Sequence, residues 1–287
     1  VSKLFLEITP SRFTEIDFHH DLNWLLHDAP IAEPALVKSI YSNIYFTECE
    51  NEQIDRFAQN IFCFDDIKRR LYTYAVGQAL IMKRPYNLFH RANLSMRNRN
   101  VPRSFGNAVT WEKPIYEHAC KILSELSRFP FPDFSLNHAV FNTNTLSLSG
   151  LQKNFDLVYL DPPYMNKKSV GVDYSNFYNF LEGLCCYDLF SAGDQRYPHR
   201  PINLKPSAWT SRATALDELS RISAYWDTAT IVLSYRGDGV PSKPEIVECF
   251  EQQGRVVLNG HSEDYKYALS IKEDASEHII IALPINA

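Results

Sequence analysis

The short segment Asp161-Pro162-Pro163-Tyr164 combines residue types that could act together on an amino group. Asp161 offers carboxylate oxygens, and Pro162 offers a carbonyl oxygen with no N–H beside it, because proline lacks an amide hydrogen. Two acceptors aimed at the two hydrogens of an exocyclic amine would localise a nitrogen lone pair that is otherwise delocalised into a ring. The two prolines fix two φ angles, so the acceptors would be held in place in advance. Tyr164 adds a flat face on which a base could stack.

The residues around this segment indicate where it would lie in a fold. Residues 155–160 read Phe-Asp-Leu-Val-Tyr-Leu, a short apolar run typical of a buried strand. From residue 139 onward such runs alternate with helical patterns, which predicts an α/β fold whose sheet is covered on both faces. In such sheets ligands bind at the carboxyl ends of the strands, where Asp161 follows. Asp-Pro-Pro is equally an ordinary way to end a strand. The expected strands are 139–141, 155–160, 230–234, 255–258 and 278–283, with 264–270 in an antiparallel hairpin at the sheet edge.

The whole run 155–164 resembles motif IV of the amino-methyltransferases. Segments 83–111, 174–183 and 233–239 also match, in type and order, a set of adenine-specific DNA methyltransferases from restriction-modification systems. This resemblance implies a site-specific enzyme that transfers a methyl group from S-adenosyl-L-methionine to N6 of an adenine flipped out of double-stranded DNA. It implies a Rossmann-like sheet with a mainly helical DNA-recognition insertion. Its catalytic residues would be Asp161, Pro162, Pro163 and Tyr164.

Cytosine N4 methylation uses the same chemistry, commonly with Ser in place of Asp. The carboxylate of Asp161 favours adenine without excluding cytosine.

Four aromatic or basic residues are expected around the target base. Tyr174 and Tyr178 follow the catalytic turn closely, whereas Tyr235 and Arg236 end the next strand on the ligand side of the sheet. The alternative for the second pair is that the strand simply ends before the turn at residues 237–239. The apolar spacing of 177–184 predicts a helix with Phe177 in the core and Ser175 as its N-cap.

A basic segment from Lys83 to Lys113 holds seven cationic residues and one acidic residue, Glu112. Interleaved aromatic residues make it a candidate for phosphate contact and base stacking, and a solvated basic face is the alternative. The neighbouring patterns predict helices within 50–80 and from 111 or 114 to 126. The predicted DNA-binding residues are Lys83, Arg84, Arg91, Arg97, Arg99 and Arg103.

The cofactor half of the expected site is incomplete. The family carries a Phe-x-Gly-x-Gly turn after its first strand, and this sequence contains none. Asn144 and Asp161 are the remaining candidates for contact with the cofactor. Three explanations stay open: a split enzyme whose glycine-rich half is a second polypeptide, a fragment of a longer protein, or a relative that binds DNA without catalysis. We favour the partner chain, because a sheet lacking its central strands would leave an edge to be covered.

Composition sets broad limits. The chain has 287 residues, 45% of them hydrophobic, and a net charge of -5, which is enough apolar material for one large or two small domains. We expect a mainly helical region at 1–134 and a catalytic α/β region at 135–287. Apolar runs far shorter than a membrane span and the lack of a signal-peptide pattern predict a soluble, cytoplasmic protein. The six cysteines form no CxxC pair, so buried free thiols and no metal site are expected.

Overall fold

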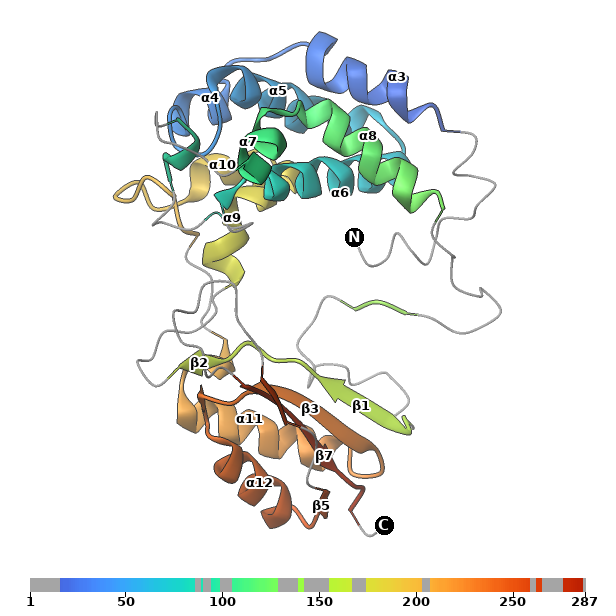
Figure 1. Cartoon of the computed structure of the whole chain (residues 1–287), viewed down its shortest axis with the longest axis vertical. Helices are drawn as coiled ribbons and strands as arrows, with labels where there is room; N and C mark the ends of the chain where they lie inside the picture. Colours follow the sequence, from blue (N-terminus) through green and yellow to red (C-terminus); the bar gives the residue numbers. More distant parts are fainter. Residues whose placement is uncertain are drawn as a thin grey trace. The chain divides into compact units, whose positions relative to one another are not determined.

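A computed structural model of the chain describes residues 16–85, 89, 94–98, 105–128, 139–141, 155–166, 174–202, 207–258, 262–264 and 276–285. The chain forms two compact units (Figure 1). The described residues of Val1–Phe141 and Ser175–Asn203 make up a helical unit, and those of Asn142–Tyr174 and Leu204–Ala287 make up an α/β unit. The predicted boundary at residue 134 therefore misses one feature: the segment from Ser175 to Asn203, expected in the α/β region, belongs to the helical unit.

Local capping explains how the helical unit begins its two long helices. The side chain of Thr47 and the carboxylate of Glu50 form a reciprocal capping box at the start of α5. Asp65 accepts hydrogen bonds from the backbone N–H groups of Ile67 and Lys68 and starts α6, so the helical pattern over 50–80 is two helices.

Within the described residues, no helix has both the length and the apolar character to cross a membrane. The elements are α3 (Phe18–Asn23), η1 (Trp24–Asp28), α4 (Leu36–Ile40), α5 (Glu48–Asn60), η2 (Ile61–Cys63), α6 (Asp66–Met82), η5 (Met96–Asn98), α7 (Phe105–Glu112), α8 (Ile115–Leu126), α9 (Tyr174–Cys185) and α10 (Leu189–Ala192).

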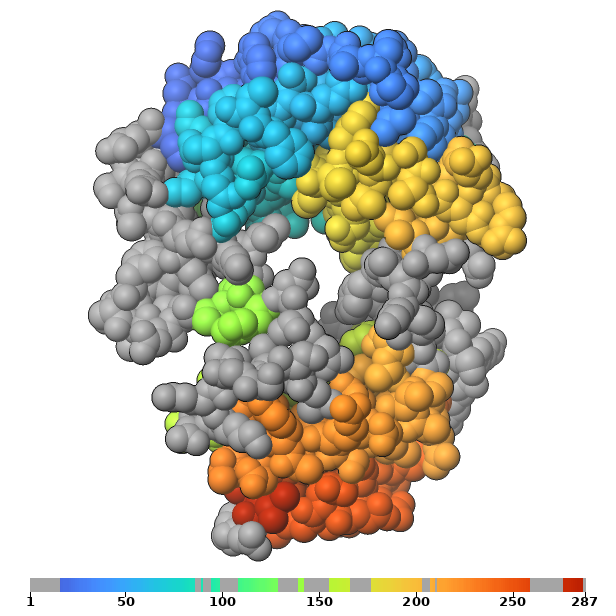
Figure 2. All heavy atoms as spheres, turned by 180° about the vertical axis from the view of Figure 1, so that it is seen from behind, coloured from blue at the N-terminus to red at the C-terminus, as the bar shows by residue number. Residues whose placement is uncertain are grey.

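Aromatic packing explains why α9 joins the helical unit. The ring of Phe180 lies 5.0 Å from Phe89 in a stacked contact and 5.2 Å from Tyr45 in an edge contact. The hydroxyl of Tyr187 accepts a hydrogen bond from the N–H of Leu36 at 2.7 Å. Figure 2 shows this yellow segment against the blue and cyan helices. Phe177, the predicted core residue, is half-buried, whereas Phe180 and Leu184 on the same apolar face are fully buried. Ser175 is not the N-cap, since α9 already begins at Tyr174.

The α/β unit contains a mixed sheet with strand order β1-β3-β7-β5, and β6 also pairs with β7. β1 and β3 are parallel, whereas β7 runs antiparallel to β3, β5 and β6. The sheet confirms the α/β class and the strands expected within 155–160, 230–234, 255–258 and 278–283. The strand expected at 139–141 is not formed. The elements are β1 (Leu157–Leu160), β2 (Met165–Asn166), η7 (Ala208–Thr210), α11 (Arg212–Tyr225), β3 (Thr230–Arg236), β4 (Gly239–Val240), α12 (Lys243–Gln252), β5 (Val257–Leu258), β6 (Ser262–Asp264) and β7 (Ser276–Ala282).

The described helices of this unit cover one face of the sheet. Val158 and Leu160 of β1, with Ile231, Leu233 and Ile280, pack on α11 and α12, which lie on the same side of the strands (Figure 1). Side chains on a strand alternate between faces, so the residues between these point to the other face. That second face is apolar and open: Leu157, Tyr159 and Leu258 are 55%, 57% and 45% exposed. The strand before Asp161, predicted to be buried, is therefore half covered, and it is the edge strand of the described sheet.

Arg255 joins the helical layer of the α/β unit to its strands. The side chain is 3% exposed and donates to the carbonyls of Trp226 and Ser223 near the end of α11. It also donates to the carbonyl of Ala229 before β3 at 2.8 Å and to that of Leu283 after β7 at 3.1 Å. Because one guanidinium bonds four backbone carbonyls, three of them in buried contacts, its loss would remove a donor from each of the four.

We predict that Arg255→Met lowers the free energy of unfolding by about 3 kcal/mol, because buried carbonyls would lose their hydrogen bonds. Urea unfolding followed by circular dichroism measures the change. Arg221→Met is the matched control, since Arg221 is also on this unit but its side chain is 61% exposed. Equal urea midpoints for the two variants would contradict the prediction.

Candidate functional site

The segment 161–164 follows β1 directly and is fastened at its far end. Because β1 and β3 are parallel, the carboxyl ends of both strands meet at one edge of the sheet. Directly after Tyr164, Met165 and Asn166 form β2 and pair with Val240 and Gly239 of β4. The turn is thus held between β1 and a short second ladder. Within it the side chain of Asp161 is exposed and the two prolines are half-buried.

Tyr235 supports the turn from the end of β3. The rings of Tyr235 and Tyr164 make a T-shaped contact, with centroids 6.0 Å apart and planes at 81°. The ring of Trp209 lies 6.3 Å from the ring of Tyr235. The Tyr235 hydroxyl donates to the carbonyl of Val240 at 2.8 Å. Burial raises the pKa of Tyr235 well above its usual value, and Arg236 only partly offsets this, so the phenol remains a donor. Tyr235, predicted to line the base pocket, is 1% exposed and packs in the core beside Tyr164.

Arg236 lies against the Tyr164 ring, with its guanidinium carbon 5.2 Å from the ring centroid. Its Nε donates to the carboxylate of Asp238. The turn between β3 and β4 that brings these groups together needs glycine at 239, because a Cβ there would lie 2.5 Å from Cε1 of Tyr235. Sequence reasoning treated 237–239 only as a turn and so missed Asp238. The signal in the sequence was the spacing of Asp238 two residues after Arg236 at the end of a strand, which allows the two side chains to bond.

The other two predicted pocket residues lie on α9. Tyr178 is half-buried and packs against the core of the helical unit. Tyr174 is the first residue of α9, and its side chain lies outside the described residues. Tyr178 therefore belongs to the helical unit, whereas Asp161 and Tyr164 belong to the α/β unit.

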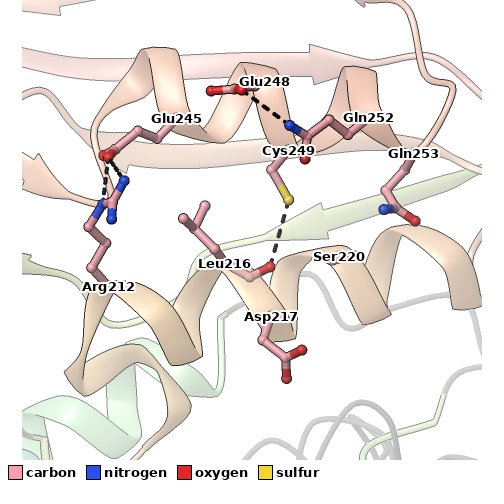
Figure 3. A pocket seen from close by; sticks show the side chains of 9 residues that line it. All are labelled: Arg212, Leu216, Asp217, Ser220, Glu245, Glu248, Cys249, Gln252 and Gln253. Carbon is pink, nitrogen blue, oxygen red and sulfur yellow. Dashed lines mark hydrogen bonds and ion pairs between the residues drawn. The ribbon is translucent and has the colours of Figure 1, made fainter.

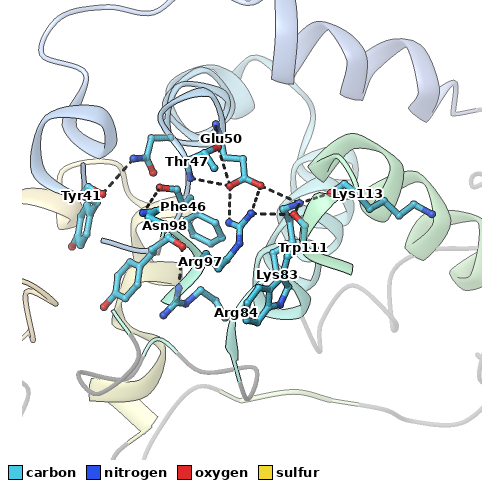
Figure 4. A network of polar contacts seen from close by, with 12 residues as sticks. Tyr41, Phe46, Thr47, Glu50, Lys83, Arg84, Arg97, Asn98, Trp111 and Lys113 are labelled. Atoms are coloured by element: carbon cyan, nitrogen blue, oxygen red, sulfur yellow. Dashed lines mark hydrogen bonds and ion pairs between the residues drawn. The ribbon is translucent and has the colours of Figure 1, made fainter. Parts of the chain in front are cut away.

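Three of the predicted DNA-binding residues are buried inside the helical unit. Lys83 and Arg84 are each 1% exposed and Arg97 is 7% exposed. Both terminal nitrogens of Arg97 donate to the carboxylate of Glu50, at 2.6 and 2.8 Å, and Nζ of Lys83 lies 3.0 Å from the same carboxylate (Figure 4). Arg84 donates to the carbonyl of Tyr45 at 3.0 Å. The structure therefore places these three predicted DNA-binding residues in the interior, where their polar groups bond within the fold.

Four other predicted site residues lie outside the described residues. They are the DNA-binding candidates Arg91, Arg99 and Arg103 and the cofactor-binding candidate Asn144.

Glu50 is the centre of this buried ion cluster. Burial alone would raise its pKa, but the hydrogen bonds and charges of Arg97 and Lys83 outweigh that effect and hold the pKa below its ordinary value. Lys83 also donates to the backbone carbonyl of Trp111, so the cluster joins the ends of α6 and α7 to the start of α5 (Figure 4). The Thr47-x-x-Glu50 capping box in the sequence indicates the start of α5 but not the pairing of Glu50 with the two cations.

A separate polar pocket lies between α11 and α12 (Figure 3). Arg212 forms an ion pair with Glu245 at one end, and the thiol of Cys249 donates to the carbonyl of Leu216 at 3.7 Å. The pocket contains none of the predicted site residues. No group of three His, Cys, Asp or Glu side chains that could hold a metal ion occurs in the part of the chain that the structure describes. All six cysteines are free thiols, but only Cys120 and Cys249 are buried as expected.

We predict that Glu50→Gln lowers the free energy of unfolding by about 3 kcal/mol or more, because two buried cations lose the charge that compensates them. The full chain is unfolded in urea and followed by circular dichroism. Glu125→Gln is the matched control: Glu125 also pairs with a lysine, but it is 65% exposed, and the change should cost less than about 0.5 kcal/mol. A Glu50 variant as stable as this control would show that the cluster is not needed for the fold.

The chain was also compared with known proteins. No protein-family model, no curated protein and no solved structure matches it. The candidate site is thus defined by its own residues, chiefly Asp161, Tyr164 and Arg236 at the ends of β1 and β3.

Proposed function

We propose that this chain is the catalytic half of an S-adenosylmethionine-dependent DNA methyltransferase that modifies N6 of a flipped adenine. The observation that carries the proposal is the place of Asp161. Its exposed carboxylate follows β1 at the carboxyl edge of two parallel strands, where ligands bind in sheets of this kind. The pairing of β2 with β4 fixes the turn on its other side.

The chemistry of the turn suits an amino group on a base. A carboxylate oxygen of Asp161 and the carbonyl oxygen of Pro162 would accept the two amine hydrogens, which localises the lone pair on nitrogen. Acceptors held by two prolines need little rearrangement when the substrate arrives. Tyr164, which is half-buried beside them, would stack on the flipped base.

The residues of this chain do not make a complete site for the methyl donor. The sequence lacks the glycine-rich turn on which the methionine part of S-adenosylmethionine would lie. Of the two predicted cofactor contacts, Asp161 is described and Asn144 lies outside the described residues. We therefore assign to this chain the orientation of the amine and place the cofactor turn on a second polypeptide.

The open face of the sheet supports this second polypeptide. Leu157 and Tyr159 of the edge strand, together with Leu258, form an apolar face with half-buried Val232, Ile279 and Ile281 between them. Fully burying a side chain of this size stabilises a complex by about 1.5–3 kcal/mol. A partner that adds a strand to the free edge of β1 and lays helices over this face would complete a sheet covered on both sides. It would also bring a glycine-rich turn to the same carboxyl edge as Asp161.

We predict that Asp161→Asn lowers the methylation rate of the complex by at least about 100-fold, because an amide binds the amine hydrogens far less strongly than a carboxylate. Transfer of labelled methyl groups to unmethylated plasmid DNA measures the rate. Asp156→Asn is the matched control, since Asp156 is also exposed but lies at the opposite end of β1. Full activity of the Asp161 variant would refute the proposed role.

The same assay separates the rival functions. A wild-type complex that binds DNA but never methylates it would be an inactive specificity subunit. Analysis of the modified nucleosides distinguishes N6-methyladenine from N4-methylcytosine.

We predict that Tyr159→Lys abolishes copurification with the partner encoded beside this chain, because a charge would be buried in the contact. Phe62→Lys is the matched control: Phe62 is 52% exposed, close to the 57% of Tyr159, but belongs to the helical unit. Size-exclusion chromatography and methylation of DNA are measured for both variants. Strong activity and tight cofactor binding by the chain alone would contradict the need for a partner.

A further inference from the structure

Two neighbouring residues at the end of β3 hold the Tyr164 ring. Tyr235 makes a T-shaped contact with it, with the two planes at 81°, and Tyr235 is itself fixed by its hydrogen bond to Val240. The guanidinium of Arg236 lies over the ring, 5.2 Å from its centroid. A single ring contact leaves Tyr164 free to tilt. The guanidinium over its face restricts this tilt.

The charges around Arg236 indicate that it does not serve as a phosphate anchor. Its Nε donates to Asp238, two residues later in the turn that follows β3. The position opposite Arg236 in the sheet is Glu277, which accepts a hydrogen bond from the hydroxyl of Ser234 at 2.5 Å. The side chain of Arg236 is 15% exposed. A cation bonded to one acid, with a second acid at the paired position, is poorly placed to attract an anionic backbone.

We propose that Arg236 is a positioning residue that acts through Tyr164. It sets the plane on which the target base stacks, and Asp238 fixes the guanidinium that does so. The inference rests on the proposed function and goes beyond it, because it gives Arg236 a role on the Tyr164 ring in place of direct contact with the nucleotide. Lysine would keep the charge, but it lacks the planar fork that lies on a ring and bonds an acid at the same time.

The test is a double-mutant cycle in the complete enzyme, formed by the chain and its partner, on unmethylated plasmid DNA. Arg236→Met should raise KM for DNA roughly 3-fold to 30-fold, the range expected for a cation on an aromatic ring, with a smaller change in kcat. Arg236→Lys should recover only part of the loss. In a Tyr164→Leu background, Arg236→Met should have no further effect, since the ring through which it acts is gone.

The outcomes separate the two proposals. Losses that simply multiply in the double variant would show that Arg236 acts independently of Tyr164, and would overturn the positioning role alone. An unchanged KM in Arg236→Met would also overturn the positioning role alone. The exposed control Arg221→Met should leave KM unchanged. A wild-type complex without methylation activity would overturn the proposed function and this inference with it. Urea unfolding of each variant identifies any loss caused by misfolding.

Discussion

The register of β3 is the constraint on which the candidate site depends. This strand is hydrogen-bonded to β1 on one edge and to β7 on the other, so it cannot shift without breaking both ladders. Its last two residues point to opposite faces: Tyr235 enters the core and Arg236 reaches the Tyr164 ring. A shift of one residue would exchange these two side chains. The turn after β1 is likewise tied to the end of β3 through the pairing of β2 with β4.

In the helical unit, buried charged side chains neutralise one another inside the fold. One carboxylate, Glu50, bonds both Arg97 and Lys83, and the backbone carbonyl of Trp111 accepts a further hydrogen bond from each of them. Buried ion clusters of this kind contribute little net stability, but they tolerate the loss of a member poorly. The basic character of the segment from Lys83 to Lys113 is thus partly structural. Its positive charge in the sequence is larger than the charge it can present to a phosphate backbone.

Local patterns predicted much of the α/β unit, because short apolar runs and turn residues act over a few positions. The strands at 155–160 and 230–234 and the location of Asp161 after the first of them could be read in this way. The role of Lys83 and Arg97 could not, since their partner Glu50 lies 47 residues before Arg97 and nothing local specifies that pairing. The same limit applies to α9. Its apolar face was visible in the sequence, but the aromatic core that receives Phe180 is assembled from residues far earlier in the chain.

The half-covered sheet has a consequence for how the protein is made in the cell. A free strand edge beside an apolar face is a template for pairing with other copies, so chains synthesised without the proposed partner would tend to self-associate. Under the proposed function, synthesis of both polypeptides in matched amounts, close together in time, would limit this. It would also make modification conditional on assembly: a surplus of one half would add aggregates and chaperone load without adding active enzyme.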